Sequence, residues 1–222
     1  MIRAISDWTQ AVSEPFWASA NLCLPRNAVA LVVLAHNESA EERKLLRRKI
    51  TEHLAGHRLA CCTVGLTNGD EHVAGRMILD TETLADRFRG VVEYLAQCEE
   101  TCGLPMAIFG EDYCGAAAMM VAADGMNCVK AVGAYCGRPD LARLYLPHVP
   151  VPTLLVVPGR DRELLARNEG AFGALGCASQ IAVIGNATRS LCESGATHAC
   201  RYLIRRWCEN HVVPSNRRTH VC

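Results

Sequence analysis

The sequence has no excess of charge of either sign. Its 222 residues include 23 Lys and Arg residues and 23 Asp and Glu residues. A protein that binds nucleic acid or an anionic membrane mainly by electrostatic attraction needs a basic surface, so we expect neither as the main partner. A small-molecule ligand or a protein partner is expected instead. The sequence does not indicate the oligomeric state.

Long apolar runs and a signal peptide are also missing. No stretch approaches the roughly 18 apolar residues of a membrane span, and the opening MIRAISDWTQ has no unbroken apolar segment. The 13 cysteines are odd in number and lie in apolar runs such as ACCTVGL, which is typical of reduced thiols. We therefore expect a cytoplasmic protein without a membrane segment.

The cysteines lack the close spacing that starts most zinc sites. No two of them are separated by two residues. The looser groupings are Cys98 with Cys102, and Cys192 with His198, Cys200 and Cys208. We expect buried, inert thiols, with no metal and no cofactor.

From residue 28 onward, short apolar runs alternate with helical patterns. Strands are predicted for AVALVVLA, RLACCTVGL, MAIF, CVKAVGAY, TLLVV and QIAVI. Helices are predicted from a capping box at Ser39 and Glu42 to Gly56, over 83–98, directly after MAIF, over 163–175 and over 194–210. This alternation predicts an α/β protein with a mostly parallel, doubly wound sheet and helices on both faces.

One domain is predicted over residues 1–211, because the chain shows no linker, internal repeat or low-complexity tract. The first 27 residues are expected to form a β-rich edge of this domain. Residues 212–222 are basic and are expected to form a flexible tail.

Four polar segments follow predicted strands, namely AHNES, GEDYCG, PGRD and GNATR. Ligands of open α/β sheets bind at the carboxyl ends of the strands, so these segments should converge on one site.

In this order the motifs resemble the dienelactone-hydrolase-like branch of the α/β-hydrolase family, over nearly all of residues 16–211. The segments that carry the resemblance are LVVLAH, FG followed by GAAA, GRPDLA, LPHVPVPTLLVVPGRD, NAT and the late RRW. The resemblance implies an α/β-hydrolase fold. It also implies a Ser or Cys nucleophile on a Gly-x-nucleophile-x-Gly turn, then an Asp and a His, with an oxyanion hole near the first loop.

The resemblance places Asp161 at the family's acid position, where its other possible role is to cap a helix. An alignment without gaps puts Asp112 at the nucleophile position, Tyr113 at the residue whose backbone N–H would serve an oxyanion, and Cys114 at the second glycine. An alignment shifted by one residue would make Cys114 the nucleophile but would leave Gly110 unexplained. We therefore prefer Asp112.

The expected histidine is replaced. Arg189, in IGNATR, stands directly after QIAVI, where the family has its catalytic His. His198, in SGATH, spells the family's Gly-Ala-Thr-His, but it is expected on the final helix and away from Asp161. The first loop has His36 and Asn37 where the family has His-Gly-x-Gly, so the close backbone approach of an oxyanion hole is lost. His36 is expected to anchor the loop, although in principle it could supply a base.

Arginine cannot act as a general base near neutral pH. We therefore predict a pseudohydrolase that binds a small ligand or a protein partner and does not turn over ordinary esters. The alternative is an active small-substrate hydrolase that uses Asp112 or Cys114 on an ester, lactone or related bond. Arg189 is expected to form a buried ion pair with Asp112, Asp161 or both.

Overall fold

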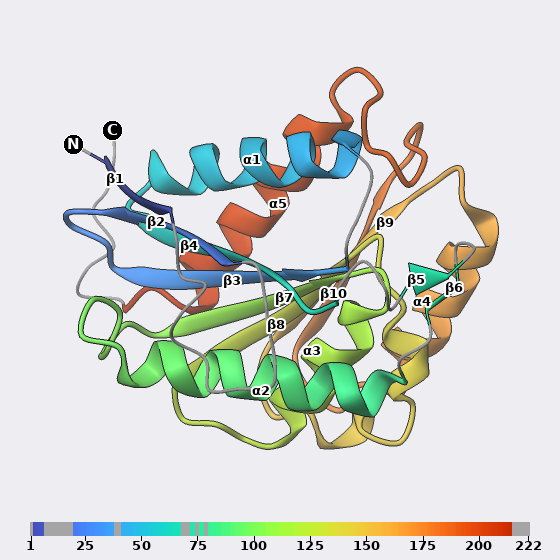
Figure 1. The fold of residues 1–222 in the computed structure, drawn as a ribbon. Helices are drawn as coiled ribbons and strands as arrows, with labels where there is room; N and C mark the ends of the chain where they lie inside the picture. Colours follow the sequence, from blue (N-terminus) through green and yellow to red (C-terminus); the bar gives the residue numbers. More distant parts are fainter. Residues whose placement is uncertain are drawn as a thin grey trace.

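The computed structural model describes residues 2–6, 20–37, 41–67, 72–73, 76–77 and 80–214. Within these residues, eight strands form one sheet in the order β1-β2-β4-β3-β7-β8-β9-β10 (Figure 1). Their bounds are β1 (Ile2–Ser6), β2 (Ala20–Pro25), β3 (Ala30–His36), β4 (Leu59–Gly65), β7 (Met106–Glu111), β8 (Val129–Tyr135), β9 (Thr153–Pro158) and β10 (Ser179–Ile184).

Only the amino-terminal edge of this sheet is antiparallel. β1 pairs antiparallel with β2, and β2 pairs antiparallel with β4, whereas every pair from β4 through to β10 is parallel. The predicted β-rich edge and the predicted mostly parallel sheet are therefore both confirmed.

Helices cover both faces of the sheet, as predicted. Their bounds are α1 (Glu41–Ala55), α2 (Thr81–Gln97), α3 (Cys114–Ala123), α4 (Arg162–Ala174) and α5 (Ala196–His211), with short 3-10 helices η2 (Pro139–Ala142) and η3 (Leu146–His148). In Figure 1, α1 and α5 lie together on one face, and α2 and α3 lie on the other. α4 packs against η2 and β9.

The strand directions show at which edge of the sheet β1 begins and α5 ends. α5 follows β10 and runs back along the sheet, so it ends at the edge opposite the carboxyl ends of the parallel strands (Figure 1). β1 points the same way as the parallel strands, because two antiparallel pairings separate it from β4. β1 therefore begins at that opposite edge.

The apolar runs form strands because helices cover them on both sides. Every residue of β7 and β9 is buried, which is the pattern of central strands in a parallel sheet. The Ala-rich α3 is buried through most of its length, since it packs against β7, β8 and α2. Small side chains let these elements approach closely.

Some boundaries differ from the sequence expectation. α2 begins two residues before the predicted start at residue 83, because the side chain of Asp80 accepts a hydrogen bond from the Thr83 N–H at 2.7 Å and caps the helix. Two short strands, β5 (His72–Val73) and β6 (Arg76–Met77), form a ribbon that was not predicted. Ser39 of the predicted capping box and residues 215–222 of the predicted tail lie outside the described residues.

The expectation of buried thiols is only partly right. Cys61, Cys62, Cys114, Cys136, Cys200 and Cys208 are buried, but Cys102 and Cys192 are exposed. Over the described ranges, no group of three or more His, Cys, Asp or Glu side chains has the arrangement of a metal site. None of the described helices is long and apolar enough to span a bilayer.

Candidate functional site

Strand β7 passes directly into helix α3 through a tight turn, residues 110–114, here called the elbow. Asp112 has a φ of +51°, a left-handed conformation that is uncommon for a residue other than glycine. Gly110 is required by close packing, because a Cβ there would lie 1.9 Å from the carbonyl oxygen of Cys114. The expected strand-to-helix turn is present, and Asp112 stands at its strained position.

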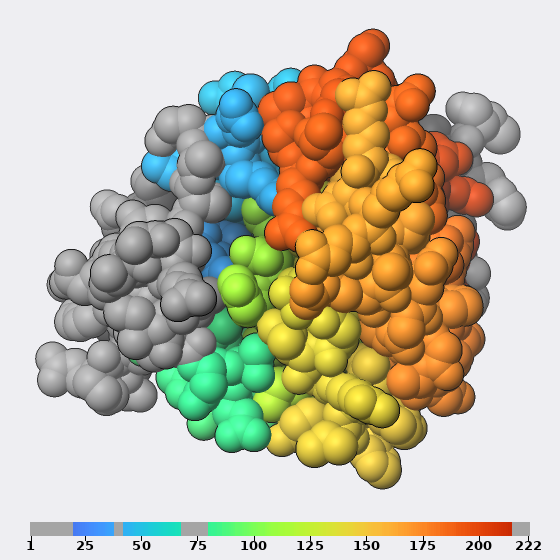
Figure 2. Space-filling view, turned by 90° about the vertical axis from the view of Figure 1, so that its right-hand side faces the viewer, coloured from blue at the N-terminus to red at the C-terminus, as the bar shows by residue number. Residues whose placement is uncertain are grey.

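The elbow lies at the carboxyl edge of the sheet, which Figure 2 faces. There the lime-coloured elbow segment comes to the surface between the yellow segment around η2 and the orange-red segment that follows β10. The backbone of Asp112 is held from the η2 side, because its carbonyl oxygen accepts a hydrogen bond from the Arg138 N–H at 2.9 Å. The elbow (GEDYCG) and the segment after β10 (GNATR), two of the four predicted strand-end segments, therefore lie close together at this edge.

The Asp112 side chain is half-buried, and nearby positive charges offset the cost of burying its carboxylate only in part. Burial raises the pKa of its carboxyl group, although Arg189, Arg43 and Arg138 lower it in part. No side chain of the described residues donates a hydrogen bond to this carboxylate. Asp112 therefore combines a left-handed backbone with a largely desolvated carboxylate.

Cys114 is the first residue of α3 and is fully buried. Its thiol donates a hydrogen bond to Oδ1 of Asn37 at 2.9 Å, and burial raises its pKa well above the usual value. The thiol is therefore protonated at neutral pH and points into the protein. The geometry does not favour Cys114 as a nucleophile.

The first loop is tied to the elbow through Asn37. His36 ends β3, and its Nδ1 lies 2.8 Å from the carbonyl oxygen of Asn37. Burial, aided by Arg47, lowers the pKa of His36 to about 4, so the ring is neutral at pH 7. Asn37 is only 5% exposed, and its Oδ1 binds the thiol of Cys114. The contact supports the expected anchoring role of His36, while residues 38–40 lie outside the described residues.

A buried ion cluster at the start of the elbow, centred on Glu111, was not predicted from the sequence. Glu111 is 3% exposed, and its two carboxylate oxygens each lie 2.8 Å from a guanidinium nitrogen, one of Arg43 and one of Arg47. The hydroxyl of Tyr135 donates a hydrogen bond of 3.1 Å to the same carboxylate. We call these four residues the Glu111 cluster. The two arginines are one helical turn apart on α1, a spacing that was available in the sequence.

A second ion pair, between Asp161 and Arg189, joins the segments that follow β9 and β10. Asp161 caps α4, since its Oδ1 accepts the Leu164 N–H at 2.9 Å, and its Oδ2 accepts a hydrogen bond from Nε of Arg189. Burial alone would raise the pKa of Asp161, but these hydrogen bonds lower it overall. The helix cap and the contact with Arg189 are thus both present.

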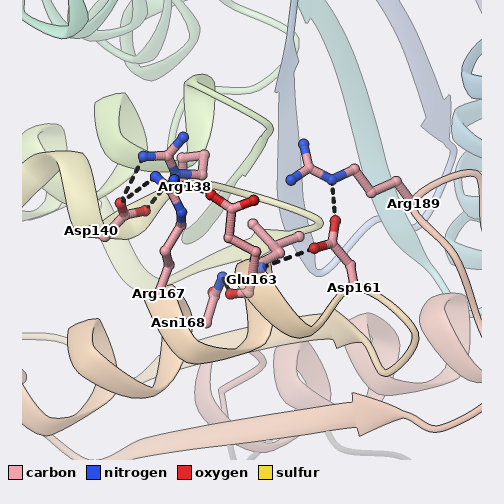
Figure 3. A network of polar contacts seen from close by, with 8 residues as sticks. Arg138, Asp140, Asp161, Glu163, Arg167, Asn168 and Arg189 are labelled. Atoms are coloured by element: carbon pink, nitrogen blue, oxygen red, sulfur yellow. Dashed lines mark hydrogen bonds and ion pairs between the residues drawn. The ribbon is translucent and has the colours of Figure 1, made fainter.

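The pair between Asp161 and Arg189 is exposed, which differs from the expectation of a buried pair. The Arg189 side chain is 46% exposed and that of Asp161 20% exposed. In Figure 3 the two terminal nitrogens of Arg189 point away from Asp161. No hydrogen bond joins Arg189 to Asp112 within the described part of the chain, so the predicted pairing of these two residues is limited to attraction through space.

A further polar network joins η2 to α4 (Figure 3). Arg138 makes two hydrogen bonds of 2.8 Å to the carboxylate of Asp140, which also lies 3.6 Å from Arg167. Asn168, which is buried, donates to the carbonyl oxygen of Gly137 at 3.1 Å. These contacts, which were not predicted from the sequence, fix the loop after β8 beside the elbow.

His198 lies on the first turn of α5, as predicted. Its Nδ1 is 3.2 Å from a guanidinium nitrogen of Arg201, and its ring stacks on Tyr202 at the surface. No contact with Asp161 is found among the described residues. The local Gly-Ala-Thr-His sequence does not supply a histidine to the site.

Solved structures of hydrolases share this fold. A dienelactone hydrolase from Anabaena variabilis superposes with a TM-score of 0.86 at 29% sequence identity, covering 95% of this chain and 99% of that one. The esterase domain of a Rhodothermus marinus protein gives a TM-score of 0.71 at 16% identity, covering 96% and 99%. Est1E from Butyrivibrio proteoclasticus gives 0.71 at 10% identity, covering 89% and 96%.

Among curated proteins, the chain is 32% identical over 203 residues to proteins from two strains of Mycobacterium tuberculosis whose name proposes a phosphoribosyl transferase. The match covers 91% of this chain but only 46% of those proteins, so the chain spans about half the length of the curated relatives it matches. No protein-family profile matches the sequence.

Proposed function

We propose, from the dienelactone-hydrolase-like α/β-hydrolase fold that the chain has, that it is a pseudohydrolase. In this proposal the elbow and the loops around it bind a small polar molecule or a protein partner. Hydrolysis of ordinary esters by a nucleophile, a histidine base and an acid does not occur.

The contact between Arg189 and Asp161 carries the proposal. In hydrolases of this fold the acid orients a histidine, which takes the proton from the nucleophile. Here Asp161 accepts a hydrogen bond from the Nε–H of an arginine, and a guanidinium cannot take a proton near pH 7. A site of this kind can bind and orient a ligand, but it has no base at this position.

The exposed groups indicate what such a ligand would contact. Asp112 offers a half-buried acceptor without a hydrogen-bond donor among the described residues, and Arg189 directs its terminal nitrogens away from Asp161 (Figure 3). A molecule with a hydroxyl or protonated group beside an acceptor oxygen fits both. Neutral imidazole at His36 lies deeper, next to the Glu111 cluster, and is less accessible.

One observation favours an active enzyme as the second candidate. Asp112 has the left-handed φ that the nucleophile of such an elbow adopts. A carboxylate in this position can form a covalent ester intermediate with a suitable substrate. Such an ester must then be hydrolysed by activated water. Arg189 cannot activate that water, so this candidate predicts a single turnover unless the substrate supplies a base.

The name of the curated relatives does not extend to this chain by itself. Those proteins are more than twice the length of the matched region, since the match covers 46% of them. One fold can host many different activities, so a shared fold does not indicate a shared reaction. Phosphoribosyl transfer is therefore not part of the proposal.

The test is release of nitrophenol from p-nitrophenyl acetate by the wild type, by Asp112→Ala and by the double variant Asp112→Ser with Arg189→His. We expect the wild type to match Asp112→Ala, with no sustained turnover. The double variant should gain measurable turnover if residues 112 and 189 occupy the nucleophile and base positions. Sustained turnover by the wild type that is lost in Asp112→Ala would reject the pseudohydrolase proposal.

Binding needs its own measurement. Thermal shift with a panel of small hydroxy acids and their lactones, repeated with Arg189→Met, reports ligands of the site. A shift in the wild type that Arg189→Met abolishes supports binding at the elbow. A shift that is equal in both proteins places the ligand elsewhere.

A further inference from the structure

Two cysteines face each other across the antiparallel edge of the sheet. Cys23 of β2 is paired directly with Cys61 of β4 in the strand register. Residues directly opposite in an antiparallel pair share one face of the sheet, with Cα atoms about 4.5–5.5 Å apart. Disulfides require Cα separations of about 4.4–6.8 Å, so the backbone already meets the requirement.

The surroundings of the two sulfur atoms agree with this pairing. Sγ of Cys61 lies 3.3 Å from the hydroxyl oxygen of Thr51 on α1. Burial, and after it the charge of Glu52, the next residue of the same helix, raises the pKa of Cys23. Both thiols therefore face α1. Both are free in this structure.

The two thiols differ in access. Cys23 is partly exposed, whereas Cys61 is fully buried. An oxidant can therefore reach Cys23 first, and Cys61 is placed to react with the product. Burial raises the pKa of both thiols, so the reactive thiolates are scarce at neutral pH and the oxidation should become faster as the pH rises.

We propose that Cys23 and Cys61 form a redox-modification site, at which a peroxide converts the two thiols into a cross-strand disulfide. The sulfur of Cys23 attacks one peroxide oxygen and becomes a sulfenic acid, releasing one water. The sulfur of Cys61 then attacks the sulfur of Cys23 and displaces the hydroxyl group, which leaves as a second water with the proton of Cys61. Two thiols are oxidised and one hydrogen peroxide is reduced to two waters.

The neighbouring cysteines do not fit this role as well. Cys62 follows Cys61 directly and so points to the opposite face of the sheet, where its partner in the register is Leu22. Cys208 of α5 lies close to Cys61. Burial, and after it the charge of Cys61, raises the pKa of Cys208, and the Cys208 side chain is buried. Cys208 is therefore the competitor that an experiment must distinguish.

Formation of the bond would fasten the edge of the sheet. β2 connects the amino-terminal strand β1 to β4, and the cross-link would close the chain segment that holds β3 and α1. Opening of this edge by fraying would then require breaking a covalent bond. The inference does not depend on the proposed function of the elbow.

The test uses the full-length protein, fully reduced and then exposed to hydrogen peroxide without denaturant. Free thiols are blocked with N-ethylmaleimide under denaturing conditions, and the cross-linked peptides are identified by mass spectrometry. We expect a peptide that joins Cys23 to Cys61 and has lost two hydrogen atoms. Amide hydrogen exchange in β2 should slow after oxidation and recover after reduction.

The variants give the controls. Cys23→Ser should lose the cross-link, and Cys62→Ala, a change at a buried neighbour on the opposite face, should keep it. Cys61→Ala should leave Cys23 as a sulfenic acid that dimedone labels. A cross-link between Cys61 and Cys208, or recovery of both Cys23 and Cys61 as N-ethylmaleimide adducts after peroxide, would overturn the proposal.

Discussion

Two sets of ion pairs flank the elbow, and they differ mainly in burial. On the strand side, Glu111 is 3% exposed, forms ion pairs with two arginines of α1 and accepts a hydrogen bond from a tyrosine hydroxyl. After β9 and β10, Asp161 and Arg189 are joined by one hydrogen bond, and the arginine side chain is 46% exposed. Both sets pair a carboxylate with a guanidinium, but one is shielded from water and the other is exposed to it.

The difference separates what holds the elbow from what a ligand can reach. A buried carboxylate needs its cations, since removing one partner leaves an uncompensated charge in a medium of low polarity. An exposed pair is weakened by water and salt, and each partner can exchange for a ligand at small cost. The Glu111 cluster fixes α1 against β7, whereas the proposed ligand would contact the exposed pair at Arg189.

The largest effect is expected for Glu111→Gln. The change leaves Arg43 and Arg47 buried without their shared counter-charge, at a cost of about 3–5 kcal/mol in the free energy of unfolding. Urea unfolding followed by circular dichroism measures it. Glu163→Gln is the control, because Glu163 pairs with Arg167 at the surface and should change stability by less than about 0.5 kcal/mol. Equal urea midpoints for the two variants would contradict the contrast.

A smaller loss is expected for Tyr135→Phe, which removes only the hydroxyl that donates to Glu111. A hydrogen bond to a charged group contributes about 1.5–3 kcal/mol, and the carboxylate keeps its two arginines. Thermal unfolding at pH 7 checks the loss. Tyr202→Phe removes a hydroxyl from a side chain that is 44% exposed and serves as the comparison. A melting temperature no lower than that of Tyr202→Phe would show that the hydroxyl adds nothing to the cluster.

Asp112 is influenced by both sets of ion pairs, and the pH dependence of stability in Asp112→Asn tests its desolvation. Because the folded-state pKa of Asp112 is raised above 3.8, the folded protein holds this proton more tightly than the unfolded chain. The stability that this group contributes is thus lost as pH rises through the folded pKa. The wild type should therefore lose stability relative to the Asn variant between pH 4 and pH 7. Urea midpoints that shift in parallel for the two proteins would show that Asp112 is not desolvated.

The smallest effect is expected for Arg189→Met. Its ion pair with Asp161 is half exposed, so the loss should be about 0–1 kcal/mol, far below that of Glu111→Gln. The buried pair that the sequence analysis expected would instead cost about 3–5 kcal/mol. Differential scanning calorimetry in low and high salt measures the difference. A drop as large as that of Glu111→Gln would mean that the pair is buried in solution.

The fold could be predicted because its signals are local and periodic. The run AVALVVLA became β3, TLLVV became β9, and the turn at Gly110 followed from a strand that leads directly into a helix. The contact between Arg189 and Asp161 was also expected, since both positions follow neighbouring strands at one edge of the sheet.

Burial and long-range pairing could not be predicted. Glu111 and Arg47 are 64 residues apart, and the useful spacing of Arg43 and Arg47 is hidden in a helix that carries further basic residues. Only packing of α1 against the end of β7 reveals which cations are internal. The exposure of Arg189 likewise depends on the loop after β10, whose course no residue pattern specifies.

The positions of the first strand and the last helix have a practical consequence for experiments on the isolated chain. β1 begins and α5 ends at the edge opposite the elbow, and β3, with its seven residues, separates the two edges by roughly 23 Å. An affinity tag, a fluorophore or a surface anchor introduced before β1 or after α5 therefore starts on the far side of the molecule. A sensor chip that captures the protein in this way presents the elbow to the solution, so ligand screening can use immobilised protein without obstructing Asp112 or Arg189.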